Sequence, residues 1–303
     1  MKTTDIKTVI AASAARIAAR PRTLPIFGVT AAGLVLRFAA VIDGPAGRSC
    51  RADAGDVPVM LPTLNAGTDY AICLGADGGL VATDWDHLAG DVVGGFHFAP
   101  GGNATGRAGG DSAPTINPFS CWDLGWRPTC PDPRGMACVD GRFWADIYLT
   151  GVNALKDGSS VYGADIADGR SLPVRADGKV SPRFDYEVAT AVMAALGKTL
   201  LSIEDFFAAA FGVTEATSVG SDPVRTGLDA PRTSKWGLMQ ATGNMTIWGH
   251  DGDPDGPRRA ALLGGDWDGG DWSGSRFAGV SHWPVSSDGW IGARGRSDHL
   301  ALV

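Results

Sequence analysis

Two glycine-rich segments close to the C-terminus, residues 264–267 (GGDW) and 292–295 (GARG), constrain this chain more than any other feature. Glycine lets strands and loops approach one another closely, so such segments are typical of a stiff frame. The residues between them mix small and polar side chains with the large rings of Trp272 and Trp290. Rigid aromatic rings provide contact area at low entropic cost, and Ser, Gly and Asp provide adaptable hydrogen bonds. The segment therefore predicts a binding face held on a rigid scaffold.

The composition favours a fold of many short elements. The 303 residues include 43 Gly and 18 Pro, which imply frequent turns and favour a β-rich or loop-rich fold over a helix bundle. A hydrophobic content of 44% suffices for ordinary cores, and the length suits one large or two medium domains. The net charge of -7 and the lack of a Lys/Arg cluster argue against a nucleic-acid partner. No apolar run is long enough for membrane insertion.

The N-terminus has the spacing of an amphipathic helix. Four apolar residues follow helical periodicity: Ile6, Val9, Ile10 and Ile17. Arg16 and Arg20 interrupt the apolar run that a signal peptide would need. We therefore expect residues 1–23 to form a short docking helix, with a coiled-coil segment for attachment to a virion as the alternative.

The cysteines form an odd set that matches neither a CxxC pair nor a zinc site: Cys50, Cys73, Cys121, Cys130 and Cys138. Cys130 and Cys138 could form a disulfide across the intervening turn. Because the sequence shows no sign of secretion, we expect buried free thiols instead.

Short strands separated by turns are expected in residues 24–118. The runs 35–38, 69–74 and 79–83 are bounded by turns such as Asp77-Gly78, and Asp-Gly between extended runs is a hairpin signal. This part predicts a small antiparallel β-sandwich that ends in a polar linker, residues 99–118.

A second domain is expected over residues 119–303. Residues 143–149 (FWADIYL) predict a buried strand. Two helices are expected, one over 186–196 and one that begins after Ser202 as its N-cap and ends at Gly212. The predicted fold class is therefore α+β, an antiparallel β-sandwich followed by a domain with two helices and short antiparallel strands.

The glycine- and tryptophan-rich frame belongs to an ordered series: residues 243–248 (GNMTIW), 262–267 (LLGGDW), 275–276 (SR) and 291–294 (IGAR). This series resembles the C-type-lectin-like domain shared by formylglycine-generating enzymes and the variable proteins of diversity-generating retroelements. The usual pattern has Trp where this chain has Thr246. In physical terms, Trp248 and Trp267 fill the core beneath the glycines. Arg276 or Arg294 can donate paired hydrogen bonds to backbone carbonyls or carboxylates.

Longer runs in a fixed order make the resemblance more specific: residues 64–72, 94–101, 132–136, 143–149, 151–153, 211–218, 233–237, 273–276, 292–295 and 298–300. On these runs the chain resembles the bacteriophage major tropism determinants, from about residue 30 to its C-terminus. The front end departs from the pattern, and we expect the N-terminal β-prism module of that family to be absent.

The resemblance implies a homotrimeric receptor-binding protein at the tip of a phage tail fibre, with a bacterial cell surface as the alternative location. It implies recognition without catalysis, cofactor or bound metal. The partner would be a protein or another receptor on the cell surface, which would set host tropism. It also implies that a diversity-generating retroelement varies the C-terminal face by adenine-specific mutagenesis. Carried onto this sequence, the variable positions are Asp266, Asp268, Gly269, Gly270, Trp272, Gly279, Ser281, His282, Ser286, Asp288, Trp290 and Ile291. Mutating the adenines of an AAC codon cannot produce Trp, so Trp272 and Trp290 do not fit this codon. The other ten positions fit about as often as chance allows, so variability at all twelve rests on the resemblance.

Two other function classes are compatible with this frame. One is a structural or glycan-binding lectin-like module; a calcium-dependent sugar lectin would need carboxylates near the last strands, which Asp266, Asp268 and Asp288 could provide. An oxidase of the formylglycine-generating type would need reactive cysteines in this domain, but no Cys follows Cys138.

Acidic motifs elsewhere have simpler structural interpretations. Residues 250–256 (HDGDPDG) resemble the start of a calcium loop, but Leu262 stands where the bidentate Glu of an EF-hand would be, so we expect a solvated turn. The pairs Asp84/His87 and Asp298/His299 are expected to make structural hydrogen bonds.

Overall fold

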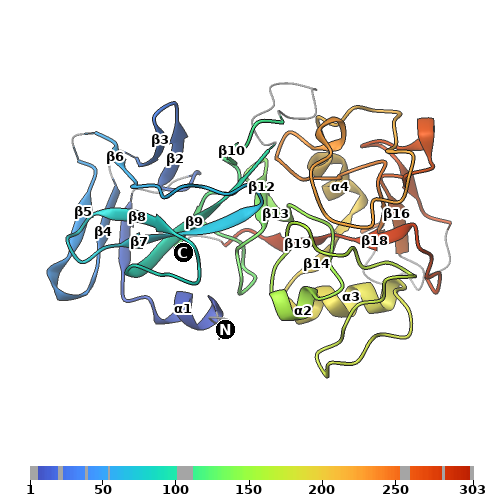
Figure 1. The fold of residues 1–303 in the computed structure, drawn as a ribbon, viewed down its shortest axis with the longest axis horizontal. Coiled ribbons are helices and arrows are strands. Elements are labelled where there is room, and N and C mark those ends of the chain that lie inside the picture. The colour runs from blue at the N-terminus through green and yellow to red at the C-terminus, as the bar shows by residue number, and fades with distance from the viewer. Residues whose placement is uncertain are drawn as a thin grey trace.

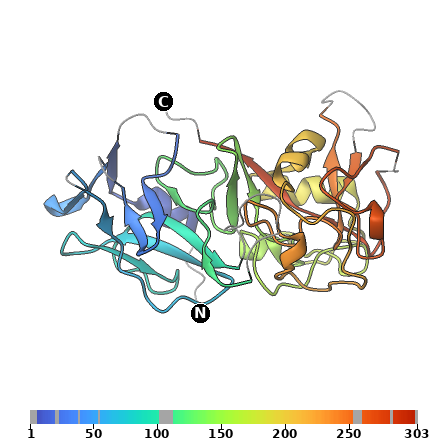
Figure 2. The ribbon, with the colours of Figure 1, turned by 90° about the horizontal axis from the view of Figure 1, so that it is seen from above.

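The computed structural model describes residues 6–19, 23–37, 40–53, 55–100, 112–252, 260–281 and 284–300. They form two lobes that lie side by side along the longest axis, the N-terminal part of the chain in one and most of the remainder in the other (Figure 1). From above, the last strand runs back from the second lobe towards the first (Figure 2).

Small antiparallel sheets surround the core of the first lobe. The first contains β1 (Arg16–Ala19), β4 (Ala40–Asp43) and β5 (Ser49–Arg51). The second contains β2 (Phe27–Thr30), β3 (Gly33–Leu36) and β6 (Val57–Pro58). The third contains β7 (Thr68–Leu74), β8 (Leu80–Thr83), β9 (Asp91–Ala99), β10 (Thr115–Ile116) and β11 (Trp122–Asp123). The antiparallel pairing and the strands at 35–36, 69–74 and 80–83 agree with the sequence prediction.

The N-terminal helix is shorter than predicted. Helix α1 covers only Ile6–Ala12, and Arg16–Ala19 form β1, which pairs with β4. Exposed Arg16 and Ala18 alternate with Ala15 and Ile17, which pack on the first-lobe core, so this stretch has the period of a strand. The edge of β4 offers backbone hydrogen-bond partners that a continued helix would leave unused. Residues 16–19 therefore pair with β4 as a strand instead of extending the helix.

The third sheet extends beyond the residues in which we expected the first domain to end. β10 lies inside the predicted linker 99–118 and pairs with β9. β11 follows the expected boundary at residue 118 and pairs with β9 as well. Each strand is only two residues long, which is too short for an alternating pattern to be recognised in the sequence, and β10 also lies in a polar segment.

A mixed sheet organises the second lobe. Its path is β12 (Met136–Val139), β13 (Phe143–Asp146), β19 (Gly295–Asp298), β14 (Thr199–Ser202), β15 (Thr246–His250), β16 (Ala260–Leu263) and β17 (Ala278–Gly279), with β18 (Ile291–Ala293) beside β15. Most pairs are antiparallel, as predicted, but β15 runs parallel to both β14 and β18. Long connections make such parallel pairs possible, because the chain must return before each one.

The two predicted helices are present with short segments around them. Helix α3 (Tyr186–Ala195) has nearly the predicted bounds. Helix α4 (Ile203–Ala209) begins after Ser202, whose side chain accepts a hydrogen bond from the Asp205 amide, as predicted. It ends before the predicted Gly212: the amides of Phe211 and Val213 donate to the carbonyls three residues earlier, so the chain continues as turns up to Gly212, whose φ is +97°. The structure adds α2 (Ala154–Asp157) and the 3₁₀ turns η1 (Pro45–Gly47), η2 (Ala230–Arg232) and η3 (Gly270–Trp272).

The helices cover opposite faces of the mixed sheet. Successive residues of a strand point to opposite sides. Leu201 and Ile247 therefore join the core that contains α4, whereas Leu200 and Trp248 join the core that contains α3. Trp248 is fully buried, and Trp267 packs partly buried on the α4 side, so both have the core positions that the sequence predicts.

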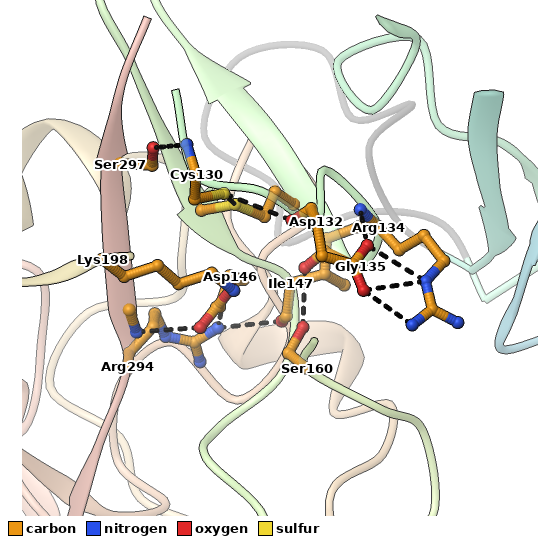
Figure 3. A network of polar contacts seen from close by, with 12 residues as sticks. Cys130, Asp132, Arg134, Gly135, Asp146, Ile147, Ser160, Lys198, Arg294 and Ser297 are labelled. Atoms are coloured by element: carbon orange, nitrogen blue, oxygen red, sulfur yellow. Dashed lines mark hydrogen bonds and ion pairs between the residues drawn. The ribbon is translucent and has the colours of Figure 1, made fainter. Parts of the chain in front are cut away.

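A buried polar network fixes the centre of the second lobe (Figure 3). The guanidinium of Arg294 donates to the carbonyls of Asp146 and Ile147, at 2.6 and 2.8 Å, and to the carbonyl of Met239. This confirms the predicted role of Arg294 as a paired donor to backbone carbonyls. Lys198 donates to the carboxylate of Asp146 at 2.6 Å, and both side chains are buried.

A second buried chain of hydrogen bonds joins the lobes. His97 on β9 contacts Asp69 on β7 through Nδ1 at 3.0 Å and the hydroxyl of Tyr148 through Nε2 at 2.9 Å. Asp69 also accepts from the amide of Gly135 at 3.0 Å. His97 is 1% exposed, so this chain positions the first lobe against the sheet of the second rather than meeting solvent.

Candidate binding face

The loop between β16 and β17 is held by glycines that admit no side chain. Gly264 and Gly265 have φ values of +91° and +74°, a region that favours glycine. A Cβ on Gly265 would lie 2.4 Å from the hydroxyl of Ser273 and 2.8 Å from its Cα. The same hydroxyl donates to the carbonyl of Asp266 at 3.1 Å. The first glycine-rich segment therefore closes the base of the loop tightly.

Residues 215–220 anchor the loop from outside. Both carboxylate oxygens of Glu215 accept hydrogen bonds from Ser275, one of them from its amide at 2.9 Å. The hydroxyl of Ser218 accepts from the amide of Gly270 at 3.0 Å. These contacts hold the loop without help from the side chains that point outward.

Trp272 is the most exposed aromatic side chain on this frame. It ends the turn η3 and is 80% exposed, the largest value among the exposed large hydrophobic residues that the structure describes. Because the backbone of the loop is already held, binding has to order only the two side-chain torsions of this tryptophan. The entropy lost on contact with a partner is therefore small.

Strand β15 brings the two ends of the predicted face together. Asn244, just before β15, forms a parallel bridge with Asp266, and the amide of Thr246 donates to the carbonyl of Trp290 at 3.1 Å. Because β16 ends and β18 begins at this edge of the sheet, Asp266 and Trp290 lie on either side of the entry to β15.

The remaining predicted positions follow β17 and the segment after it. Gly279 pairs with Leu262 at the edge of the sheet. Residues 284–288 cross towards the start of α3, where the carbonyl of Pro284 accepts from the amide of Tyr186 at 3.1 Å. The carbonyl of Asp288 accepts from the amide of Gly169 at 3.0 Å. This segment is therefore also tied to the scaffold by its backbone.

Side-chain exposure separates the predicted binding residues into classes. Four are exposed: Asp268, Trp272, Ser281 and Asp288. Six are partly buried: Asp266, Gly269, Gly270, Gly279, Ser286 and Trp290. His282 lies outside the described residues. Ile291 is fully buried in the core beneath α3, so its side chain cannot take part in contact and we correct its assignment to the face.

Two of the glycines are restricted in what could replace them. A Cβ on Gly269 would lie 2.5 Å from the hydroxyl of Ser273. Gly270 has a φ of +51°, which strains other residues, although its surroundings are open. Substitution of Gly269 therefore displaces the hydroxyl of Ser273, and substitution of Gly270 strains its own backbone, unlike substitution at Trp272 or Asp288.

Two adjoining cavities lie beside the loop. One, of about 430 Å³, is lined by residues that include Trp272, Gly274 and Asp271. The other, of about 700 Å³, is lined by residues that include Phe207 and Phe211. Glu215, Ser218, Phe207 and Phe211 were not among the predicted site residues. The run 211–218, which contains three of them, carries part of the resemblance and was the available signal for these three.

The cysteines are buried and do not fit the reactive thiols that oxidase chemistry needs. All five are free and buried, as predicted, and no disulfide joins Cys130 to Cys138. Burial raises the pKa of the Cys121 and Cys138 thiols to about 12, so both are protonated at neutral pH. None of the five lies in the binding loop.

Within the described residues, the histidines of the acidic motifs make structural contacts. The Nδ1 atom of His87 contacts Asp84 at 2.7 Å in an exposed turn, as predicted. His299 lies between Trp126 and Trp144 and accepts from the indole of Trp144 at 2.9 Å. Most of the predicted acidic turn 250–256 lies outside the described residues.

Within the part of the chain that the structure describes, no group of three or more His, Cys, Asp or Glu is placed to hold a metal ion. Asp266 uses one carboxylate oxygen to accept from the amide of Asp268 at 2.9 Å. None of the helices in that part is both long and apolar enough to cross a membrane.

Comparison with known proteins gives strong and consistent matches, although no family model matches the chain. The tail fiber receptor-binding protein of Bordetella phage BPP-1 is 42% identical over 291 residues, covering 82% of this chain and 75% of that protein. The solved structure of the Major Tropism Determinant U1 variant has a TM-score of 0.85 and 36% identity, covering 94% of this chain and 86% of that one. The I1 variant has a TM-score of 0.81 and 35% identity, covering 99% and 86%. The predicted α+β fold class is confirmed by this similarity.

Proposed function

The chain belongs to the major tropism determinant family of phage tail-fibre receptor-binding proteins, and on this premise we propose that its C-terminal face binds a receptor on the host cell. The protein acts at the tip of a tail fibre and sets which cells the phage recognises. Its relatives are named as receptor-binding proteins and tropism determinants, not as enzymes, in agreement with the sequence prediction.

This proposal rests on the exposure of Trp272 on a loop whose backbone is held by hydrogen bonds. Its ring is 80% exposed, while Glu215, Ser218 and the glycines hold the backbone beneath it. Rigid support of an exposed aromatic ring reduces the entropy lost on binding, and Trp is enriched among residues that dominate interface energies.

We further propose that this face is diversified by a retroelement. The proposed contact positions are Asp266, Asp268, Gly269, Gly270, Trp272, Gly279, Ser281, His282, Ser286, Asp288 and Trp290. The support is that the frame is fixed by backbone and glycine contacts, so outward side chains at the positions other than Gly269 and Gly270 can change while the fold persists. A nearby reverse-transcriptase gene and a near-copy of the 3′ coding segment that differs only at adenines would support this origin, and lack of both would contradict it.

We infer that the protein works as a homotrimer, as the resemblance implies. Three faces on one particle would raise avidity well above the affinity of each. Light scattering should then give about three times the chain mass of 31.3 kDa, and a monomer at working concentration would contradict the assembly.

Cell binding tests the proposed function. Labelled protein is incubated with a panel of bacterial strains that includes Bordetella, and a matched variant carries Ala at Asp266, Asp268, Trp272 and Asp288. We expect the wild type to bind at least one strain and the variant to lose that binding with an unchanged melting temperature. No binding by the wild type, or equal binding by both, would contradict the proposal.

A further inference from the structure

We propose that the receptor-binding face has a constant part, a groove beside the binding loop that takes an acidic, apolar segment of a receptor protein. The groove encloses about 700 Å³ and is lined chiefly by Phe207, Phe211, Glu215, Ser275 and Arg276. This inference rests on the proposed function and names the chemistry of the partner at that site.

Two phenylalanines give the groove an apolar wall. Phe207 on α4 is 39% exposed and Phe211, in the turn after it, is 46% exposed. Their neighbour Phe206 is buried in the core, so the exposed rings are not required to fill it. Adjacent exposed rings in a concave site are typical of a surface that a partner covers.

The charges at the groove favour an acidic partner. Arg276 is exposed and makes no hydrogen bond or ion pair with any residue in the described part of the chain. The ammonium of Lys235 lies 5.9 Å from the Phe211 ring centroid and 5.1 Å from that of Trp236. The one carboxylate in the lining, Glu215, already accepts from Ser275 through both oxygens. Arg276 in the lining and Lys235 beside it outweigh the single negative charge of Glu215, so this part of the surface has an excess of positive charge on a chain of net charge -7.

The groove is continuous with the proposed variable surface. It shares Glu215 and Arg276 with the cavity beside Trp272, so a bound segment would lie against the loop. None of its lining residues is among the positions expected to vary. All variants would therefore keep one common contact of fixed chemistry, while the loop selects among receptors that offer it.

Two labelled peptides of eight residues test the groove by fluorescence anisotropy. Both contain the same Phe and Leu residues, and they differ in carrying four Asp or four Lys. We expect the Asp peptide to bind about tenfold tighter than the Lys peptide at low salt, with the preference shrinking as salt screens Arg276 and Lys235.

Substitutions locate the binding. Phe211→Ala, and independently Phe207→Ala, should weaken the Asp peptide about fivefold, and R276E should abolish the preference. R51E changes an exposed arginine in the first lobe and should leave binding unchanged. Equal binding of the two peptides, or binding insensitive to Phe211→Ala and R276E, would overturn the proposal. A loss of oligomer mass in Phe211→Ala would also overturn it, because the groove would then join copies of this chain.

Different results would contradict the proposed function and the proposed peptide-binding groove. If Trp272→Ala loses cell binding and keeps the peptide preference, both proposals hold. If the peptides show no preference while cell binding depends on Trp272, only the groove is wrong. If the peptide preference holds but the wild type binds no cells, the proposed function fails and the groove is a peptide site of another role.

Discussion

Glu215 holds Ser275 with both oxygens of its carboxylate, across 60 residues of sequence. One oxygen accepts from the amide at 2.9 Å and the other from the hydroxyl. Gly274 lies so close that a Cβ there would approach the same carboxylate to 2.2 Å. The carboxylate of Glu215 is thus one of the anchors that close the binding loop, together with the hydroxyl of Ser218 and the tight glycines.

Replacing Glu215 should loosen the loop. Glu215→Ala leaves the Ser275 amide without its partner, and we expect a loss of about 1–3 kcal/mol in the free energy of unfolding. Faster proteolysis within residues 266–276 should accompany it. Glu204→Ala, at an exposed carboxylate on α4, is the matched control and should change stability by less than about 0.5 kcal/mol. Equal effects of the two substitutions would contradict the anchoring role.

Removing the exposed indole should affect binding and not folding. Trp272→Ala should weaken receptor binding by about 2 kcal/mol or more, roughly thirtyfold in Kd. The melting temperature should not fall, because the ring is 80% exposed. Met60→Ala, at a first-lobe residue 71% exposed, is the control and should leave binding intact. Binding titrations and thermal melts on both variants decide the point.

Ile291 should behave as a core residue in spite of its place beside the face. Ile291→Ala should lower the free energy of unfolding by about 2–5 kcal/mol, since it opens a cavity against α3. Asp288→Ala, three residues earlier and exposed, should leave stability nearly unchanged. Chemical denaturation measures both, and a neutral Ile291→Ala would restore that residue to the variable set.

The Lys198–Asp146 pair should make stability fall at high pH. Burial lowers the pKa of Lys198, but the charge of Asp146, its hydrogen bond and the charge of Asp132 outweigh burial, and the pKa rises above its usual 10.5. The stabilisation is therefore complete below pH 10.5 and is lost as the pH rises through the folded pKa. We expect Lys198→Met to cost about 3–5 kcal/mol at pH 7, because Asp146 stays buried without its cation.

Denaturant unfolding at several pH values checks this assignment. The gap in unfolding free energy between wild type and Lys198→Met should narrow above pH 10.5. Lys179→Met, at an exposed lysine in a loop, should show neither the cost nor the narrowing. A constant gap across this range would contradict the pairing.

Local patterns predicted the elements that depend on local chemistry. The Ser202 cap fixed the start of α4, and Asp-Gly turns fixed the hairpin strands of the first lobe. The sequence could not show that Arg16–Ala19 would leave the helix, because the deciding partner is the edge of β4. The alternation over residues 15–18 is too short to outweigh the helical spacing of Ile6, Val9 and Ile10 before it, so local periodicity did not predict this pairing.

The candidate site was predictable in outline and not in its supports. The glycines and Trp272 identified the loop. Ile291 is buried because β18 pairs with β15, and matching a sequence pattern position by position does not reveal this pairing. Glu215 and Ser218 reach the loop from about 50 to 60 residues earlier. Only a folded chain brings a carboxylate and an amide at that separation into contact.

Paired libraries test the central claim, that a fixed frame presents exchangeable side chains. One library randomises Asp266, Asp268, Trp272, Ser281, Ser286 and Asp288, and the other randomises six exposed positions of the first lobe. Both are displayed and selected for binding to a protein chosen in advance. We predict folded, specific binders from the first library and none from the second. Unfolded clones in the first library, or equal yields of binders from both, would contradict the account.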